Sequence, residues 1–90
     1  PNVVLMAESS AGHHDVDVDE LSPLAWRLLR VAAGYEQRAV EREVDGLLQA
    51  HVSMLERGDR MLSPERCHTL FDLYAEELDD DQIRALVDQF

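Results

Sequence analysis

Apolar residues recur every three or four positions along most of this chain, the spacing that places them on one face of an α-helix. The first such run follows Ser22 and a proline, a favoured helix start because Ser caps the helix and Pro needs no N–H partner there. Gly58 is a suitable C-cap, so the pattern predicts one long helix over residues 23–57. Gly34 and Gly46 lie inside it and mark where it would kink or break.

Two shorter helices are predicted further along the chain. A second Ser-Pro pair at Ser63 introduces an apolar stripe that predicts a helix over residues 64–78. Asp79 and the glutamine three residues later have the spacing of a capping box, which introduces a terminal helix over residues 81–90. We therefore expect a single all-α domain over residues 22–90, in which one long helix packs with two shorter C-terminal helices.

Residues 1–21 precede the first helix and carry five acids and no base. The opening PNVVLM has the composition of a short strand, but the following AESSAGHH suits no regular structure. The acids of DVDVDE stand just before the N-terminus of the long helix, where the helix dipole favours negative charge. We therefore expect a flexible acidic N-terminal arm.

The long helix carries apolar residues on two opposite faces. At about 100° per residue, one stripe runs the whole length of the helix and comprises Trp26, Leu29, Ala33, Val40, Val44, Leu47, His51 and Leu55. The other occupies only the first half and comprises Leu24, Leu28, Val31 and Tyr35. Two short helices can cover one face, so a second polypeptide is expected on the other, most simply in a homodimer. The predicted partner-binding residues are Leu24, Trp26, Leu28, Leu29, Val31 and Tyr35.

The composition fits one small globular domain. The chain has 90 residues, of which 46% are hydrophobic, and Cys67 is its single cysteine. A lone cysteine favours a reducing compartment over a disulfide scaffold, and no apolar run approaches the roughly 20 residues of a membrane helix. We therefore expect a cytoplasmic protein. All eight basic residues are arginine, a usage typical of high-GC bacterial genomes.

The net charge of −11 is concentrated towards the two ends of the sequence. Residues 22–62 are neutral, whereas residues 63–90 carry eight acids against two arginines. This balance opposes binding to a nucleic-acid backbone or an anionic membrane, and it favours a basic protein partner. The acidic run that contains Asp79, Asp80 and Asp81 is a candidate electrostatic docking patch, although such a run also suits a helix-capping turn.

No motif in the sequence specifies a catalytic or a metal site. His13, His14 and the aspartates that follow offer metal-ligating groups, but an EF-hand loop here needs Gly at position 20 and Glu at position 26, where Glu and Trp stand. Cys67 and His68 are adjacent, and adjacent helical residues point in different directions, so the imidazole does not face the sulfur. We expect Cys67 to be a core residue. We predict a binding protein without catalytic residues, metal or cofactor, rather than an enzyme.

The stretch SPLAWRLLRVAAGYEQR and the acidic termini resemble the small helical antiactivators of bacterial quorum-sensing transcription factors, among them the antiactivator of LasR. The resemblance implies a protein that binds a transcription regulator and blocks its dimerisation or its DNA binding. It transfers no functional residue to a position in this chain.

Two other functions fit the same features. A DNA mimic places carboxylates where a DNA-binding protein expects phosphates, which suits the total charge but not the neutral long helix. A type III secretion chaperone or cochaperone shares the small size, the helices and the acidity.

Overall fold

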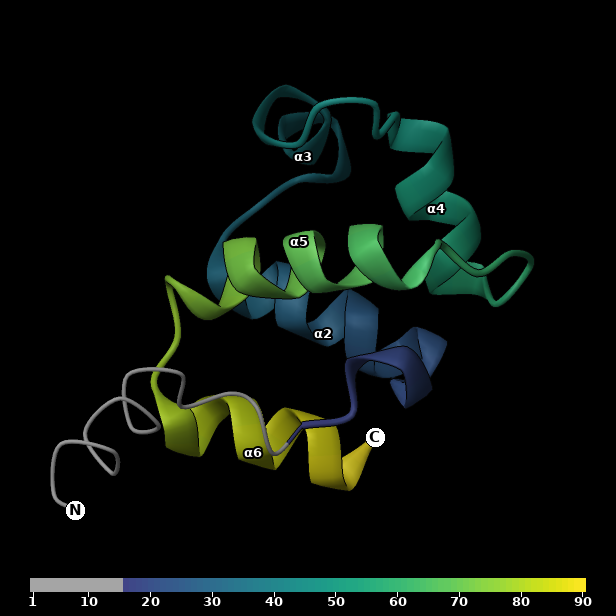
Figure 1. Cartoon of the computed structure of the whole chain (residues 1–90). Coiled ribbons are helices and arrows are strands. Elements are labelled where there is room, and N and C mark those ends of the chain that lie inside the picture. Colours follow the sequence, from purple (N-terminus) through teal and green to yellow (C-terminus); the bar gives the residue numbers. More distant parts are fainter. Residues whose placement is uncertain (1–15) are drawn as a thin grey trace, which may run out of the picture.

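The computed structural model describes residues 16–90, and every regular element in that range is helical (Figure 1). The elements are η1 (Val18–Glu20, a 3₁₀ turn), α2 (Pro23–Ala33), α3 (Gln37–Glu43), α4 (Gln49–Arg57), α5 (Pro64–Ala75) and α6 (Asp80–Gln89). The all-α prediction is therefore confirmed. The strand-like opening, the histidine pair at positions 13 and 14 and the first part of the predicted arm lie outside the described residues.

Hydrogen bonds at the caps confirm the predicted helix starts. Ser22 Oγ accepts a bond from a backbone N–H in the first turn of α2 (3.0 Å), and Ser63 Oγ does the same in α5 (3.3 Å). Before α6 the capping box is complete: Asp79 Oδ1 accepts from Gln82 N–H (2.8 Å), and Gln82 Oε1 accepts from Asp79 N–H (3.0 Å). These starts depend on local chemistry alone, which is why the sequence reveals them.

The prediction of one helix over residues 23–57 was wrong, because the chain turns twice within that range. Gly34 ends α2 in a left-handed backbone conformation (φ 87°), and its N–H donates to carbonyls of the last turn. Gly46 has φ 78° in the turn between α3 and α4. Glycine adopts this region easily because it has no Cβ, so both residues end or separate helices instead of lying inside one. Gly58 caps α4 as predicted.

The folded core begins before the predicted domain boundary at Ser22. Val18 and Leu21 are only 3% and 7% exposed, and η1 packs against α5. The three-residue repeat of a 3₁₀ turn places these two side chains on one side of the backbone, while the acids of η1 remain exposed. Residues 18–21 therefore belong to the helical domain and not to an arm.

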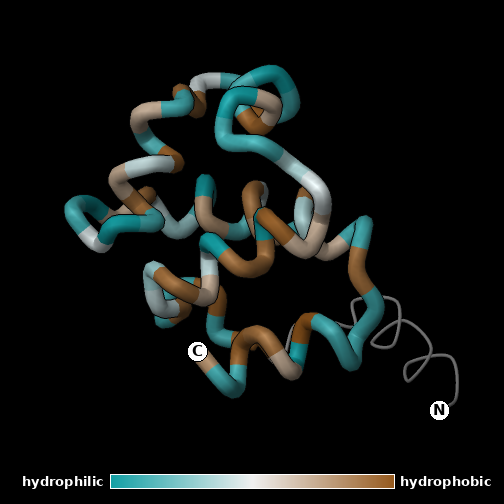
Figure 2. The backbone as a smooth tube through the Cα atoms, turned by 180° about the vertical axis from the view of Figure 1, so that it is seen from behind, coloured by the Kyte–Doolittle hydropathy of each residue, from teal (hydrophilic) through white to brown (hydrophobic). Residues whose placement is uncertain are grey.

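The central helix of the domain is α2. It packs against α4, α5 and α6, and Figure 1 shows it between α5 and α6. The longer of the two predicted apolar stripes forms core despite the breaks, because α4 packs back against α2 and α3 packs against α4. The buried members of this stripe are Trp26, Leu29, Val40, Val44, Leu47 and Leu55. Figure 2 shows apolar segments where the helices approach one another and polar segments in the outer connections.

A buried ion pair holds the segment that was predicted as one helix in its folded-back arrangement. Arg30 Nε and Nη2 of α2 donate to the Glu56 carboxylate of α4 at 2.7 and 3.1 Å, and the two side chains are 12% and 5% exposed. Arg30 Nη1 also donates to the carbonyl of Tyr35 (2.7 Å), and Gln37 Nε2 of α3 donates to Glu56 Oε1 (3.1 Å). This network joins the ends of three helices across the break at Gly34.

Tyr74 of α5 lies in the core beside this network. Its ring meets Trp26 edge-on with centroids 6.4 Å apart, and it lies 6.0 Å from the ring of Tyr35. The Tyr74 hydroxyl and the Trp26 indole N–H are buried without a hydrogen-bond partner in the part of the chain that the structure describes. Burial and, to a smaller degree, the Glu56 carboxylate raise the pKa of Tyr74 well above that of a free tyrosine.

Candidate functional site

The predicted partner-binding residues divide between the two faces of α2. Leu24 and Val31 are 46% and 56% exposed, and Leu28 is half-buried. Trp26 and Leu29 are 1% and 0% exposed. The structure therefore places Trp26 and Leu29 in the core, and their inclusion in a docking surface was wrong. They lie on the side of α2 that faces the other helices, whereas Leu24 and Val31, seven positions apart, lie on the opposite side.

We define the α2 outer face as Leu24, Arg27, Leu28 and Val31. Arg27 is exposed between the two aliphatic side chains, one helical turn from each on the same side of the helix. The face therefore presents apolar contact area around one positive charge, on a helix whose other side is covered by α4, α5 and α6. Periodicity alone identified the aliphatic members of this face.

Tyr35, the last predicted partner-binding residue, lies just beyond α2 and is half-buried against the core. Burial raises the pKa of its hydroxyl, and the carboxylates of Glu77, Glu43 and Glu76 raise it further. Tyr35 is thus partly buried beside the end of α2, rather than a fully exposed anchor.

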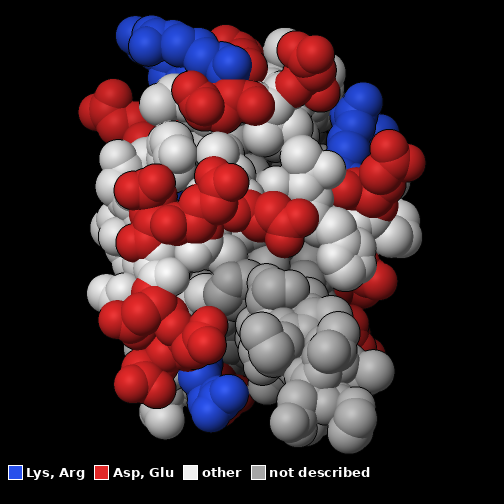
Figure 3. All heavy atoms as spheres, turned by 60° about the vertical axis from the view of Figure 1, so that its left-hand side comes forward, with Lys and Arg blue, Asp and Glu red and all other residues white. Residues whose placement is uncertain are grey.

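The predicted docking acids lie together on the surface where α5 passes into α6. Glu76, Glu77, Asp79, Asp80 and Asp81 are all exposed, and Figure 3 shows acidic side chains spread across this side of the molecule. Asp79 is also the N-cap of α6, and its two neighbours stand in the first turn, where the helix dipole favours negative charge. The acidic run therefore has a structural role besides the predicted electrostatic one.

Two further candidates from the sequence have structural positions. Cys67 is 1% exposed and its Sγ lies 3.7 Å from the Leu62 carbonyl, which confirms it as a core residue, while His68 is exposed. Burial and the Asp19 carboxylate raise the pKa of the Cys67 thiol, which disfavours the reactive thiolate. His51 is half-buried, and its Nδ1 accepts a bond from the Leu48 N–H (3.0 Å) at the start of α4.

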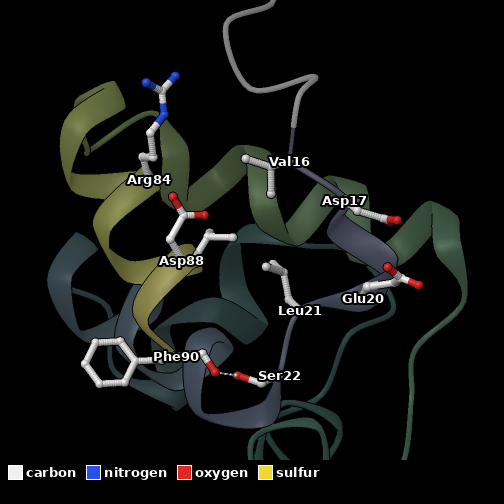
Figure 4. Close-up of a pocket in the computed structure, with 9 residues that line it drawn as sticks. Val16, Asp17, Glu20, Leu21, Ser22, Arg84, Asp88 and Phe90 are labelled. Carbon is white, nitrogen blue, oxygen red and sulfur yellow. Dashed lines mark hydrogen bonds between the residues drawn. The ribbon is translucent and has the colours of Figure 1, made fainter.

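A hollow of about 390 Å³ lies between the η1 region and α6 (Figure 4). Asp17 and Glu20 line it from one side, and Arg84 and Asp88 line it from the other. Ser22 Oγ donates a 2.6 Å hydrogen bond to the Phe90 carbonyl at one end, which ties the end of α6 to the start of α2. The charged groups of this hollow point in different directions and do not converge on one point (Figure 4).

Residues 16–90 contain no group of three or more His, Cys, Asp or Glu side chains placed to hold a metal ion. Within the same range, none of the helices combines the length and the apolar character needed to cross a membrane. The histidine pair at positions 13 and 14 lies outside the described residues, so its predicted lack of a metal site stays a prediction.

Comparison with known families places the chain in one of them. Residues 15–67 match DUF8599, a domain of unknown function, and because this is more than half of the chain, the protein belongs to that family. The match covers η1 to α4 and the start of α5, so the α2 outer face lies inside the family segment and the acidic run lies beyond it. Searches of curated proteins and of solved structures gave no match.

Proposed function

We propose that this chain is a small regulatory protein that binds another protein through the α2 outer face and thereby covers a functional surface of its partner. The observation that carries the proposal is the pair of exposed aliphatic side chains, Leu24 and Val31, on the central helix of the domain. Single exposed apolar residues are common on protein surfaces. Two that share one helical face with Leu28 form the kind of stripe by which a helix docks on a hydrophobic groove.

The charge of the molecule favours a particular kind of partner, a transcription regulator. With a net charge of −11 and an exposed acidic run at residues 76–81, the chain is attracted to surfaces rimmed with arginine and lysine. DNA-binding proteins carry such basic surfaces. A regulator bound by its dimerisation face to the α2 outer face is unable to form its dimer, so this protein acts as an antiactivator by occlusion. A second copy of the chain that binds the same face forms a homodimer. Formation of this homodimer competes with binding of the target.

DNA mimicry is the second candidate function, and the acidic side shown in Figure 3 favours it. In this case the exposed carboxylates of residues 76–81, and not the α2 outer face, contact the DNA-binding site of the target. The two functions differ in what competes with the complex. Added DNA displaces a mimic from its target, whereas it leaves an occlusion complex on a dimerisation face largely intact.

Affinity capture with matched surface variants tests the proposal. The test variant is Leu24→Ser with Val31→Ser, and the control is Phe90→Ser, which removes an apolar side chain of similar exposure (52%) outside this face. Circular dichroism establishes that both variants are folded. The proposal predicts that the wild type and the control retain a transcription regulator and that the test variant loses it. Equal recovery on all three proteins, or recovery of no regulator, would contradict it.

A further inference from the structure

A second hollow, of about 340 Å³, lies between the start of α4 and the loop that joins α4 to α5. Its lining residues are His51, Arg60, Met61, Leu62, Ser63 and Arg66. No acidic side chain lines it, in contrast to the hollow beside α6. A locally basic hollow is unexpected on a chain whose net charge is −11.

One exposed apolar side chain lines this hollow, and a second exposed apolar residue adjoins it through its backbone. Met61, which lines it, is 59% exposed, and Leu48 is 53% exposed. Leu48 adjoins the hollow because its backbone N–H donates to His51 Nδ1. Because His51 Nδ1 accepts this bond, the proton of the neutral imidazole lies on Nε2. The ring therefore also offers an N–H hydrogen-bond donor.

The positive charges of the two arginines in the hollow are available to bind a ligand. Neither the Arg60 nor the Arg66 guanidinium has an ion-pair partner among residues 16–90, whereas Arg57, three positions before Arg60, pairs with Asp59 (3.0 Å). Arg66 also lies over the turn at Gly46, where a Cβ would come within 3.3 Å of its Nη2. The Arg66 guanidinium therefore lies close to the backbone of the turn between α3 and α4.

We propose that this surface, defined as Leu48, His51, Arg60, Met61 and Arg66, docks an acidic segment of a partner protein that carries an apolar side chain beside its carboxylates. Arginine forks bind carboxylates in a bidentate manner, and methionine adapts its shape to apolar side chains of different form. An extended polyanion such as DNA, or an anionic membrane, is repelled by the acidic remainder of the molecule. A short peptide with acidic and apolar residues contacts only the hollow and so avoids this repulsion. The surface uses residues other than the α2 outer face, so it does not rest on the function proposed above.

Peptide display on the immobilised wild-type protein tests this inference. The probe is a library of random dodecamers, and the consensus that it yields is synthesised with a fluorescent label for anisotropy titration. We expect a consensus in which Asp or Glu stands beside Leu, Phe or Met. Arg60→Glu with Arg66→Glu should weaken binding of that peptide by about tenfold or more, since charge-assisted hydrogen bonds are lost. Met61→Ser should weaken it less.

The matched control is Arg38→Glu with Arg42→Glu, which changes the net charge equally at two exposed positions on α3. It should keep the peptide affinity within about twofold, because neither arginine lines the hollow and salt screens exposed charges. A selection without an acidic consensus, or a consensus peptide bound equally by the Arg60/Arg66 variant, would overturn the inference. So would displacement of the peptide by an equal concentration of a double-stranded oligonucleotide, which would reassign the arginines to phosphate binding.

Discussion

The two junctions of this molecule are built on different physical principles. Where α2, α3 and α4 meet, Arg30 and Glu56 form an ion pair that is almost fully buried and is bonded further to Tyr35 and Gln37. Where α5 meets α6, the chain is held by the capping box of Asp79, which lies on the surface among exposed acids. We expect the first junction to be costly to disturb because its charges are largely buried, whereas the second, with its exposed cap, should tolerate change.

Among the variants that test this contrast, Glu56→Ala should have the largest effect on stability. It leaves the Arg30 guanidinium buried without its carboxylate, so the free energy of unfolding should fall by about 3–5 kcal/mol, measured by urea denaturation. The double variant Arg30→Met with Glu56→Leu should recover most of this loss, because no charge is then left unpaired. A loss below about 1 kcal/mol for Glu56→Ala would show that the pair behaves as a surface ion pair.

Alkaline pH should destabilise the folded protein through Tyr74 of α5, which lies beside the Arg30–Glu56 network. The pKa of Tyr74 lies above the ordinary tyrosine value of 10.0 in the folded protein, so the unfolded chain loses its proton first as pH rises. The stabilising effect is complete below pH 10 and is lost above it, by at most about 1.4 kcal/mol per pH unit for this group. Urea denaturation from pH 8 to 11.5 measures this slope. Tyr74→Phe should flatten the slope, and an unchanged slope would assign it to other groups.

Gly34→Ala should cost about 1–2 kcal/mol, again by urea denaturation. An added Cβ meets no atom within 4 Å, so the cost comes from the left-handed backbone and not from a clash. If the variant instead gained stability, the chain would have adopted a longer helix through position 34, and the break would not be intrinsic to the fold.

Asp79→Ala should have the smallest effect on stability, about 0.5–1 kcal/mol, because it removes one exposed helix cap. Thermal unfolding followed by circular dichroism measures it. Asp79→Asn is the control, since asparagine keeps the cap and removes the charge. A loss as large as that of Glu56→Ala would erase the distinction between the two junctions.

The sequence predicts those features of the fold that depend only on residues close together in the chain. The starts at Ser22, Ser63 and Asp79, the cap at Gly58 and the core stripe all follow from local spacing, and the structure confirms them. The breaks do not follow in the same way, because a helix tolerates an internal glycine at a cost of about 1 kcal/mol. The folded-back arrangement at Gly34 is also stabilised by the pairing of Arg30 with Glu56, which lie 26 positions apart and which local spacing does not reveal.

The candidate binding surfaces, too, were only partly predictable from local sequence spacing. Periodicity separates Leu24, Leu28 and Val31 from the long stripe, but it does not show which of the two stripes stays exposed. Trp26 was therefore mistaken for an anchor, although it lies in the core. The hollow at Arg60 and Arg66 was beyond reach from the sequence, because its walls come from a turn, a loop and two helices that only the fold brings together.

Site-specific photo-crosslinking in the source cells tests the central claim, that the α2 outer face is covered by another polypeptide, most directly. A photoreactive phenylalanine derivative replaces Leu24 or Val31 in turn, and the exposed Ala85 of α6 is the control position. The account predicts a crosslinked species of one defined mass from both α2 positions and none from position 85. No crosslink from the α2 positions, or the same crosslinks from position 85, would contradict it.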